Sequence, residues 1–201
     1  MLGDKPLIGH SIQYAQQNGL KNIIVTTNDL AIQEYSKSQD IKIIERPEKL
    51  AGNEEPVITA LQHVVKNISH HYEYIILLQP TNPLRPEYML QEALQIIESR
   101  PYDSLMTVSQ SPKKLGKINS HVFTPYNYTM GQRSQDIEPL YYENGLLYII
   151  RVDLIRQGML LGENNYSFII DHPFAEIDID TLSDFKKAEL YLKYFKSIKK
   201  S

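Results

Sequence analysis

The apolar run Tyr74–Leu78 (YIILL) constrains the fold of this chain most strongly. A short run of apolar residues without alternation is typical of a strand buried on both faces, as in a parallel sheet. It leads directly into Gln79–Arg85, a loop that two prolines stiffen. Ligands of open α/β sheets bind at the carboxyl ends of strands, so polar residues of this loop are candidate contacts. They are Gln79, Thr81, Asn82 and Arg85. The same residues could instead form a turn and a helix cap.

Short apolar strands alternate with amphipathic helices along the rest of the chain. A helix expected at Lys5–Asn18 precedes the strand Asn22–Thr26, and a helix expected at Ala31–Ser38 precedes the strand Ile41–Glu45. This β-α-β order predicts an α/β fold with a mostly parallel sheet. Further strands are expected at Asp103–Ser109, Leu146–Ile150 and Tyr166–Ile170, and further helices at about 56–69, 89–97, 152–157 and 182–198.

Composition narrows the class of protein. A chain of 201 residues with 42% hydrophobic residues can bury one core, so we expect a single domain over residues 1–201. A net charge of −3 without basic clusters speaks against a nucleic-acid or membrane surface. There is no cysteine for a disulfide, a thiolate nucleophile or a zinc–thiolate site. No apolar run is long enough to span a bilayer, and a cytoplasmic location fits best.

Residues 111–142 interrupt the α/β pattern. The segment is polar, contains Pro112, Pro125 and Pro139, and holds four of the fourteen tyrosines. We interpret it as an inserted arm, because aromatic-bearing surfaces of this kind often meet another subunit.

Two carboxylates near the C-terminus form the clearest candidate site. Asp178 and Asp180 alternate with isoleucines, so in an extended strand both side chains project from one face. Paired carboxylates on a rigid strand can hold Mg²⁺ beside a phosphate group. The alternative is a helix cap, with Asp180 or Thr181 at the N-cap and Asp184 three residues after Thr181.

Six short blocks in the chain occur together in one known family. The two most specific are LLQPTNPLR at 77–85 and ENGLLYI at 143–149, and the others are GDKPLI at 3–8, RPEKLA at 46–51, QD at 135–136 and IDIDT at 177–181. In this order and combination the chain resembles the acylneuraminate cytidylyltransferases, which are CMP-sugar synthetases, over essentially its whole length. The resemblance implies a Rossmann-like, three-layer α/β/α nucleotidyltransferase fold with a small dimerisation arm at 111–142.

The resemblance also implies a reaction. The anomeric hydroxyl of a 2-keto sugar acid attacks the α-phosphorus of CTP, which releases pyrophosphate and gives a CMP-sugar. The protein mainly aligns the reactants and neutralises charge on the phosphate oxygens. Family members place Mg²⁺ on the two aspartates that match Asp178 and Asp180, and those residues are therefore the expected catalytic and metal-binding pair.

Further site residues carry over by position. Arg46 matches an arginine linked to nucleotide binding, although it could be a solvated loop end. The residues expected at the sugar acid, in addition to the four loop residues named above, are Lys114, Arg133, Gln135, Asn144 and Tyr148. Lys114 could be an ordinary surface lysine, and Tyr148 could belong to the core. Ser134 and Tyr142 stand where some members have arginine, which leaves sialic, legionaminic and other nonulosonic acids open as substrates.

The resemblance implies a homodimer in which the arm reaches the sugar pocket of the partner. Two alternatives stay open. The chain could act on an eight-carbon keto sugar acid, or it could be a non-catalytic binding subunit that keeps the fold without the chemistry.

The chain departs from the family at its beginning. Members start with a strand and a glycine-rich loop, IPARGGSK-like, that cradles the triphosphate, whereas Met1–Ile8 match the segment that follows that loop. We expect from this that the sequence is a truncated form with weak activity, and that the neighbours of the missing strand keep unpaired backbone groups.

Overall fold

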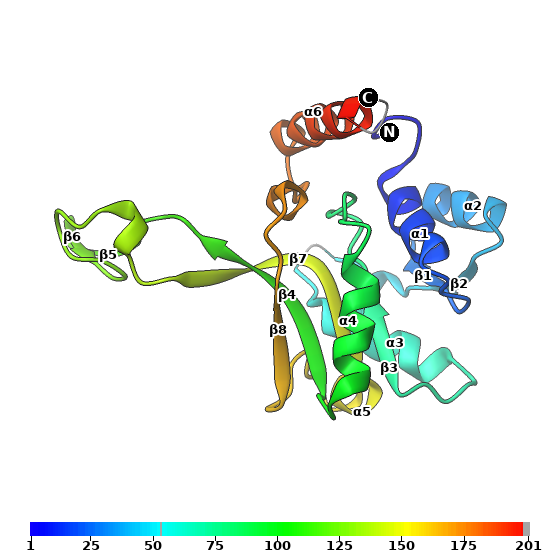
Figure 1. Ribbon diagram of the computed structural model, residues 1–201. Helices are drawn as coiled ribbons and strands as arrows, with labels where there is room; N and C mark the ends of the chain where they lie inside the picture. The colour runs from blue at the N-terminus through cyan, green and yellow to red at the C-terminus, as the bar shows by residue number, and fades with distance from the viewer. Residues whose placement is uncertain (53, 199–201) are drawn as a thin grey trace.

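The computed structural model describes residues 1–52 and 54–198 and shows an α/β chain with a projecting arm (Figure 1). Its strands are β1 (Ile24–Thr27), β2 (Lys42–Glu45), β3 (Tyr74–Leu77), β4 (Ser104–Ser111), β5 (Gly116–Asn119), β6 (Val122–Pro125), β7 (Leu140–Arg151) and β8 (Asn165–Ile169). Its α-helices are α1 (Leu7–Gln17), α2 (Leu30–Ser38), α3 (Val57–Asn67), α4 (Met89–Ser99), α5 (Val152–Arg156) and α6 (Leu182–Ile198). Short 3₁₀ turns are η1 (Glu48–Leu50), η2 (Ser134–Asp136) and η3 (Pro173–Glu176).

The main sheet has four strands in the order β3-β7-β4-β8. β7 is antiparallel to β3 and to β4, and β4 is parallel to β8. Strands β3, β4 and β8 therefore run in one direction, and β7 runs in the opposite direction. Apart from β7, the sheet matches the expected mostly parallel arrangement. β1 and β2 form a separate parallel pair in which Ile24 faces Lys42. The described strands β1 and β3 are not hydrogen-bonded to each other.

β7 divides the interior into two apolar layers. Leu147 and Ile149 point to the face covered by α4 and Tyr14 of α1, while Tyr148 and Ile150 point to the face covered by α3 and α5. The alternation follows from the two-residue period of a strand, with apolar residues on both faces. Helices on both faces of the sheet make the three α/β/α layers that the resemblance implied. Burial of each large aliphatic side chain in these layers stabilises the fold by about 1.5–3 kcal/mol.

A third apolar cluster joins both ends of the chain to the loop after β3. It contains Leu2, Leu84, Ile177 and Ala188, with Phe185 and Leu192 of α6 packed against it. The expected apolar face of the last helix is thus largely confirmed, because Phe185, Ala188 and Leu192 recur at helical spacing. This packing fixes Ile177, and with it the start of the segment that carries the two candidate carboxylates.

The arm is a two-stranded hairpin at the end of long connections from β4 and β7. Ile118 faces Phe123 across the antiparallel β5–β6 pair. Figure 1 shows this hairpin, in yellow-green, well away from the main sheet and from α6. The sequence predicted an arm at 111–142 but no hairpin, because β5 and β6 are short, largely exposed strands whose apolar residues do not alternate regularly with polar ones. The continuation of β7 back to Leu140 was missed for the same reason.

Candidate functional site

Asp178 and Asp180 lie on one exposed face of an extended segment between η3 and α6. Ile177 is 1% exposed and packs in the cluster with Leu84, and Ile179 packs beside it, whereas both aspartates are exposed. The predicted alternation is confirmed. The prediction that these residues end a strand of the sheet is wrong, since the segment has no strand partner and is held by side-chain and loop contacts.

The helix-cap alternative is also confirmed, but Thr181 and Asp184 form the cap and the carboxylates of Asp178 and Asp180 do not take part in it. The Asp184 carboxylate accepts from the Thr181 backbone N–H at 2.9 Å, and the Asp184 N–H donates to the Thr181 hydroxyl oxygen at 3.3 Å. This reciprocal pair is a capping box that starts α6. Because Thr181 and Asp184 cap the helix, the side chains of Asp178 and Asp180 stay available for another task.

The electrostatics at Asp178 favour a bound cation. Partial desolvation of the Asp178 carboxylate raises its pKa, and the nearby Asp180 and Asp184 carboxylates raise it further. A divalent ion between the carboxylates would relieve both the desolvation and the repulsion. No cluster of three or more His, Cys, Asp or Glu side chains suited to a metal occurs among the described residues. Mg²⁺ fits such a two-carboxylate site because it usually takes one or two carboxylates and completes its shell with phosphate and water oxygens.

The loop after β3 packs directly on the Asp178 segment. The Ile179 backbone N–H donates to the Thr81 carbonyl at 2.9 Å, and Asn82 Nδ2 donates to the Ile177 carbonyl at 3.1 Å. The structure therefore brings the loop predicted from the β3 strand and the carboxylate pair to one place. Gln79 and Thr81 are half-buried at this edge, while Asn82 is 1% exposed.

Arg85 is buried behind the loop. Its guanidinium donates to the Leu146 carbonyl at 2.7 Å, the Gln79 carbonyl at 2.8 Å and the Ser11 hydroxyl at 3.0 Å, and it lies over the Tyr14 ring. Burial lowers the pKa of Arg85 to about 10. Arg85 was expected to contact substrate, and that contact stays a prediction. The bonds shown here tie the loop to α1 and β7 instead.

Asn144 is also bonded internally. Its Oδ1 accepts from Thr107 Oγ1 at 2.6 Å and from the Leu146 N–H at 3.2 Å, and its Nδ2 donates to Ser109 Oγ at 3.0 Å. These partners lie on β4 and β7 where the pairing register shifts between Met106 and Val108. The predicted contact of Asn144 with the sugar acid is untested, and in this structure its amide secures an irregular part of the sheet.

Tyr148 combines a core ring with a polar tip. Its ring belongs to the cluster with Ile150, as the core alternative proposed, and its hydroxyl donates to the Glu143 carboxylate. Burial, this carboxylate and the Asp178 charge all raise the pKa of Tyr148. The hydroxyl therefore lies within electrostatic reach of Asp178. The sequence reasoning assigned no role to Glu143. Its position beside Asn144 in the ENGLLYI block was the only indication that it belongs to the site.

The remaining predicted sugar residues lie on the arm. Lys114, Arg133 and Gln135 are exposed. Lys114 donates to the Gln132 carbonyl and lies 5.3 Å from the centre of the Tyr128 ring, and Arg133 pairs with Asp136 at 2.7 Å. Figure 1 shows the arm away from the Asp178 segment, so one copy of the chain does not bring these three residues to the carboxylates.

Arg46 follows β2, in the separate β1–β2 pair. Its Nη2 donates to the Thr26 carbonyl at 2.6 Å, and burial lowers its pKa. Arg46 Nε and Thr26 Oγ1 are buried and have no hydrogen-bond partner among the described residues. A guanidinium suits a phosphate or base acceptor, and the nucleotide contact of Arg46 stays a prediction.

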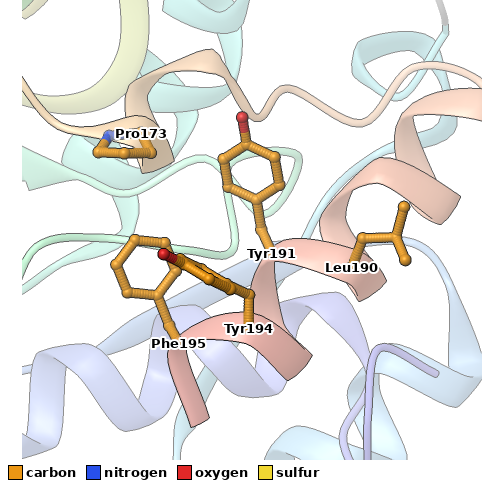
Figure 2. Close-up of a pocket in the computed structure, with 5 residues that line it drawn as sticks. All are labelled: Pro173, Leu190, Tyr191, Tyr194 and Phe195. Atoms are coloured by element: carbon orange, nitrogen blue, oxygen red, sulfur yellow. The ribbon is translucent and has the colours of Figure 1, made fainter. Parts of the chain in front are cut away.

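An apolar hollow of about 330 Å³ lies elsewhere, against α6. Figure 2 shows its lining: Pro173, Leu190, Tyr191, Tyr194 and Phe195. This lining offers no cationic group to a triphosphate, so the hollow forms no part of the candidate site. Within the described part of the chain, no helix has the length and hydropathy needed to cross a bilayer.

Comparison with known proteins decides the family. A family model described as "Cytidylyltransferase" matches residues 1–199. The chain belongs to the cytidylyltransferase family. It is 28% identical over 193 residues to an N-acylneuraminate cytidylyltransferase of Streptococcus agalactiae serotype III, with 92% of this chain and 46% of the relative covered. It is 27% identical to a CMP-N,N'-diacetyllegionaminic acid synthase of Legionella pneumophila, with 94% of this chain and 86% of the relative covered.

The chain spans about half the length of the first of these cytidylyltransferases. Solved structures agree on the fold. A CMP:2-keto-3-deoxy-manno-octonic acid synthetase complexed with CTP superposes with a TM-score of 0.69 at 16% identity, covering 96% of this chain and 90% of that chain. A 4-diphosphocytidyl-2C-methyl-D-erythritol synthase of Anaerococcus prevotii gives 0.70 at 11% identity, covering 96% and 88%. The chain has the nucleotidyltransferase fold that its sequence predicted.

Proposed function

We propose that this protein transfers CMP from CTP to a 2-keto nine-carbon sugar acid, in a Mg²⁺-dependent reaction that releases pyrophosphate. The observation that carries the proposal is the direct bonding of the Gln79–Arg85 loop to the Asp178 segment and to the Asn144–Tyr148 region. Three blocks that are far apart in the sequence form one polar edge there. Two relatives are named for an N-acylneuraminate and for a legionaminic acid, and these names support a nine-carbon sugar acid as the substrate class.

The reaction forms a bond between the anomeric oxygen of the sugar acid and the α-phosphorus of CTP and breaks the bond from that phosphorus to the pyrophosphate oxygen. The proton of the anomeric hydroxyl passes to solvent water as the bond forms, and the pyrophosphate leaves with the bonding electron pair. Asp178 and Asp180 would hold Mg²⁺, which supplies charge neutralisation at the phosphate oxygens. Arg46 would bind the nucleotide through its guanidinium group. Gln79 and the Tyr148 hydroxyl would orient sugar hydroxyls at the same edge.

The sugar carboxylate requires a cationic partner, and Arg85, the arginine of the Gln79–Arg85 loop, is already bonded internally. Arg133, Lys114 and Gln135 on the arm are suitable. We therefore include a homodimer in the proposal, in which the arm of one copy meets the carboxylate edge of the other. Large apolar side chains exposed on the arm support such a contact: Ile118, Val122, Phe123, Tyr126 and Met130.

The substrate within the class is part of the proposal. Ser134 and Tyr142 replace the arginines of some members, so sialic, legionaminic and related nonulosonic acids all belong in the assay. The proposal also retains the cytoplasmic location expected from the cysteine-free sequence.

A pyrophosphate-release assay tests the proposal, with CTP, Mg²⁺ and a panel of nine-carbon acids, an eight-carbon keto acid and no acceptor. It is run on residues 1–201 and on any longer natural form of the chain. Turnover with a nine-carbon acid that Asp178→Asn abolishes is the expected result. Preference for the eight-carbon acid would contradict the substrate class. Absence of turnover, together with no thermal shift from CTP or CDP with Mg²⁺, would favour the non-catalytic subunit.

A further inference from the structure

Asn82 joins three segments of the chain behind the carboxylate pair. Its Nδ2 donates to the Asn144 carbonyl at 3.1 Å and to the Ile177 carbonyl at 3.1 Å. Both hydrogens of the amide are thus used, in a position that is 1% exposed. A buried amide with its donors fully paired fixes the carbonyls that it binds, because losing either bond leaves a desolvated polar group.

Gly145 leaves the space that the Asn82 side-chain amide occupies. Gly145 has φ +71°, and a Cβ built there would lie 2.7 Å from Asn82 Oδ1. Any other residue would be strained by its backbone conformation and would push the Asn82 side chain away. The glycine of the ENGLLYI block is therefore explained by close approach of the Asn82 side chain.

Buried hydroxyl groups of β4 hold Asn144, which Asn82 binds, in place. Thr107 Oγ1 accepts from the Leu147 N–H at 3.1 Å in addition to its bond to Asn144, and Ser109 Oγ donates to the Ile170 carbonyl at 2.8 Å. Thr107 and Ser109 are buried on β4. Fully satisfied buried networks of this kind hold one arrangement. Asn82 therefore connects the Asp178 segment to a fixed part of the sheet.

The neighbouring Thr81 completes the connection on the site side. Its carbonyl accepts from the Ile179 N–H at 2.9 Å, and its hydroxyl donates to Asn82 Oδ1 at 3.4 Å. Two successive residues thus hold the backbone on both sides of Asp178.

We propose that Asn82 is a positioning residue: by clamping the Ile177 carbonyl to the Asn144–Gly145 turn, it holds Asp178 and Asp180 in the geometry needed to bind a divalent cation. This inference rests on the proposed function only for the role of the cation. Among the described strands none pairs with the Asp178 segment, so the clamp adds to the apolar packing of Ile177 and the Thr81–Ile179 bond in holding it. The sequence-based assignment of Asn82 as a substrate contact is thereby replaced by an indirect role.

Three variants test the clamp by different routes. Asn82→Ala removes the amide, Asn82→Asp keeps the size but removes the paired donors, and Gly145→Ala displaces the intact amide. Hydrogen exchange of the Ile179 amide and of residues 177–181 is expected to accelerate about tenfold or more in each, since each loses at least one buried hydrogen bond. Asn164→Ala is the matched control. The Asn164 side-chain amide donates to the Pro101 carbonyl at 2.7 Å, at the end of β4 and β8 away from the Asp178 segment. The Asn164→Ala variant should therefore leave this exchange unchanged.

Mn²⁺ binding, followed by electron paramagnetic resonance with and without CTP, separates positioning from general stability. The three clamp variants should bind Mn²⁺ about tenfold more weakly than the wild type, and Asn164→Ala should not. Unchanged exchange in both Asn82 variants would overturn the clamp. Faster exchange with unchanged Mn²⁺ affinity would overturn its role in positioning. If the wild type itself bound no Mn²⁺, the proposed metal role would fail first, and that result is visible without any variant.

Discussion

The body of the molecule, which lies outside residues 111–142, and the arm differ in how their polar side chains are buried and bonded. Asn82, Arg85 and Asn144 are each no more than 5% exposed and have their donors bonded to named backbone or side-chain partners. On the arm, the Arg133 side chain is 70% exposed and its partner Asp136 is 45% exposed. Buried, satisfied groups specify one geometry, whereas exposed ion pairs contribute little to stability. The body is therefore pre-arranged around Asp178, and the arm carries exposed side chains that can meet a second surface.

The largest expected effect is at the centre of the body. Asp178→Asn should lower turnover by about 10²–10³-fold, because it removes one carboxylate of the proposed cation site. The fold should persist, since the Asn side chain has the same shape and no charge to desolvate. Pyrophosphate release and thermal unfolding measure the two quantities. Turnover within a factor of three of the wild type would remove Asp178 from the chemistry.

Arg85→Ala tests whether the body depends on its buried cation. It leaves the Leu146 and Gln79 carbonyls without their donor, and each buried acceptor of this kind costs about 1–3 kcal/mol. We expect a loss of about 2–5 kcal/mol in the free energy of unfolding, measured by urea denaturation. Arg100→Ala, at the exposed end of α4, is the control and should change stability by less than about 0.5 kcal/mol. Equal effects of the two variants would contradict the structural role of Arg85.

Arg133→Ala tests the arm in the opposite sense. Its exposed ion pair with Asp136 is worth at most about 1 kcal/mol, so unfolding should hardly change. The KM for the sugar acid should rise about tenfold, because the substrate carboxylate loses a bidentate partner. Arg156→Ala, on α5 and away from the arm, should leave KM unchanged. A KM that does not move in Arg133→Ala would assign the carboxylate to another cation.

The smallest expected effect is the pH dependence of stability at Asp178. Burial and the neighbouring carboxylates raise its pKa in the folded state above the ordinary 3.8, so the folded state holds this proton more tightly than the unfolded state. Its contribution to stability therefore falls as pH rises from about 3.8 through the raised pKa. The Tm advantage of Asp178→Asn over the wild type should be near zero below that window and constant above it. An advantage that shrinks with rising pH would contradict the direction of the shift.

The sequence predicted local elements better than their long-range partners. The helix at 182–198 and the alternation of Ile177, Asp178, Ile179 and Asp180 follow from spacing alone, and both are confirmed. The reversed direction of β7 was not predictable, because an apolar strand between two others has the same pattern in either direction. The antiparallel pairing of β7 with β3 and β4 depends on contacts between residues far apart in the sequence, such as Tyr74 with Arg151 and Ser104 with Ile150.

Candidate site residues show the same division. The position of the Thr81 loop at the end of a strand was predicted, but its contact with the Asp178 segment was not. The internal bonding of Asn82, Arg85 and Asn144 was not, because a polar residue in a motif has the same letter whether it binds a ligand or the protein. The separation of Lys114 and Arg133 from Asp178 depends on the hairpin arm, whose short strands lack the regular apolar alternation that would predict them.

Subunit complementation tests the central claim most directly: that the body of one copy and the arm of another form the site. Asp178→Asn inactivates the body, and the double variant Lys114→Ala with Arg133→Ala inactivates the arm. Each is assayed alone and after equal mixing under conditions that exchange subunits. Half of the dimers are then mixed and each holds one intact site, so about a quarter of wild-type turnover should return. Turnover equal to the mean of the two separate variants would contradict the claim.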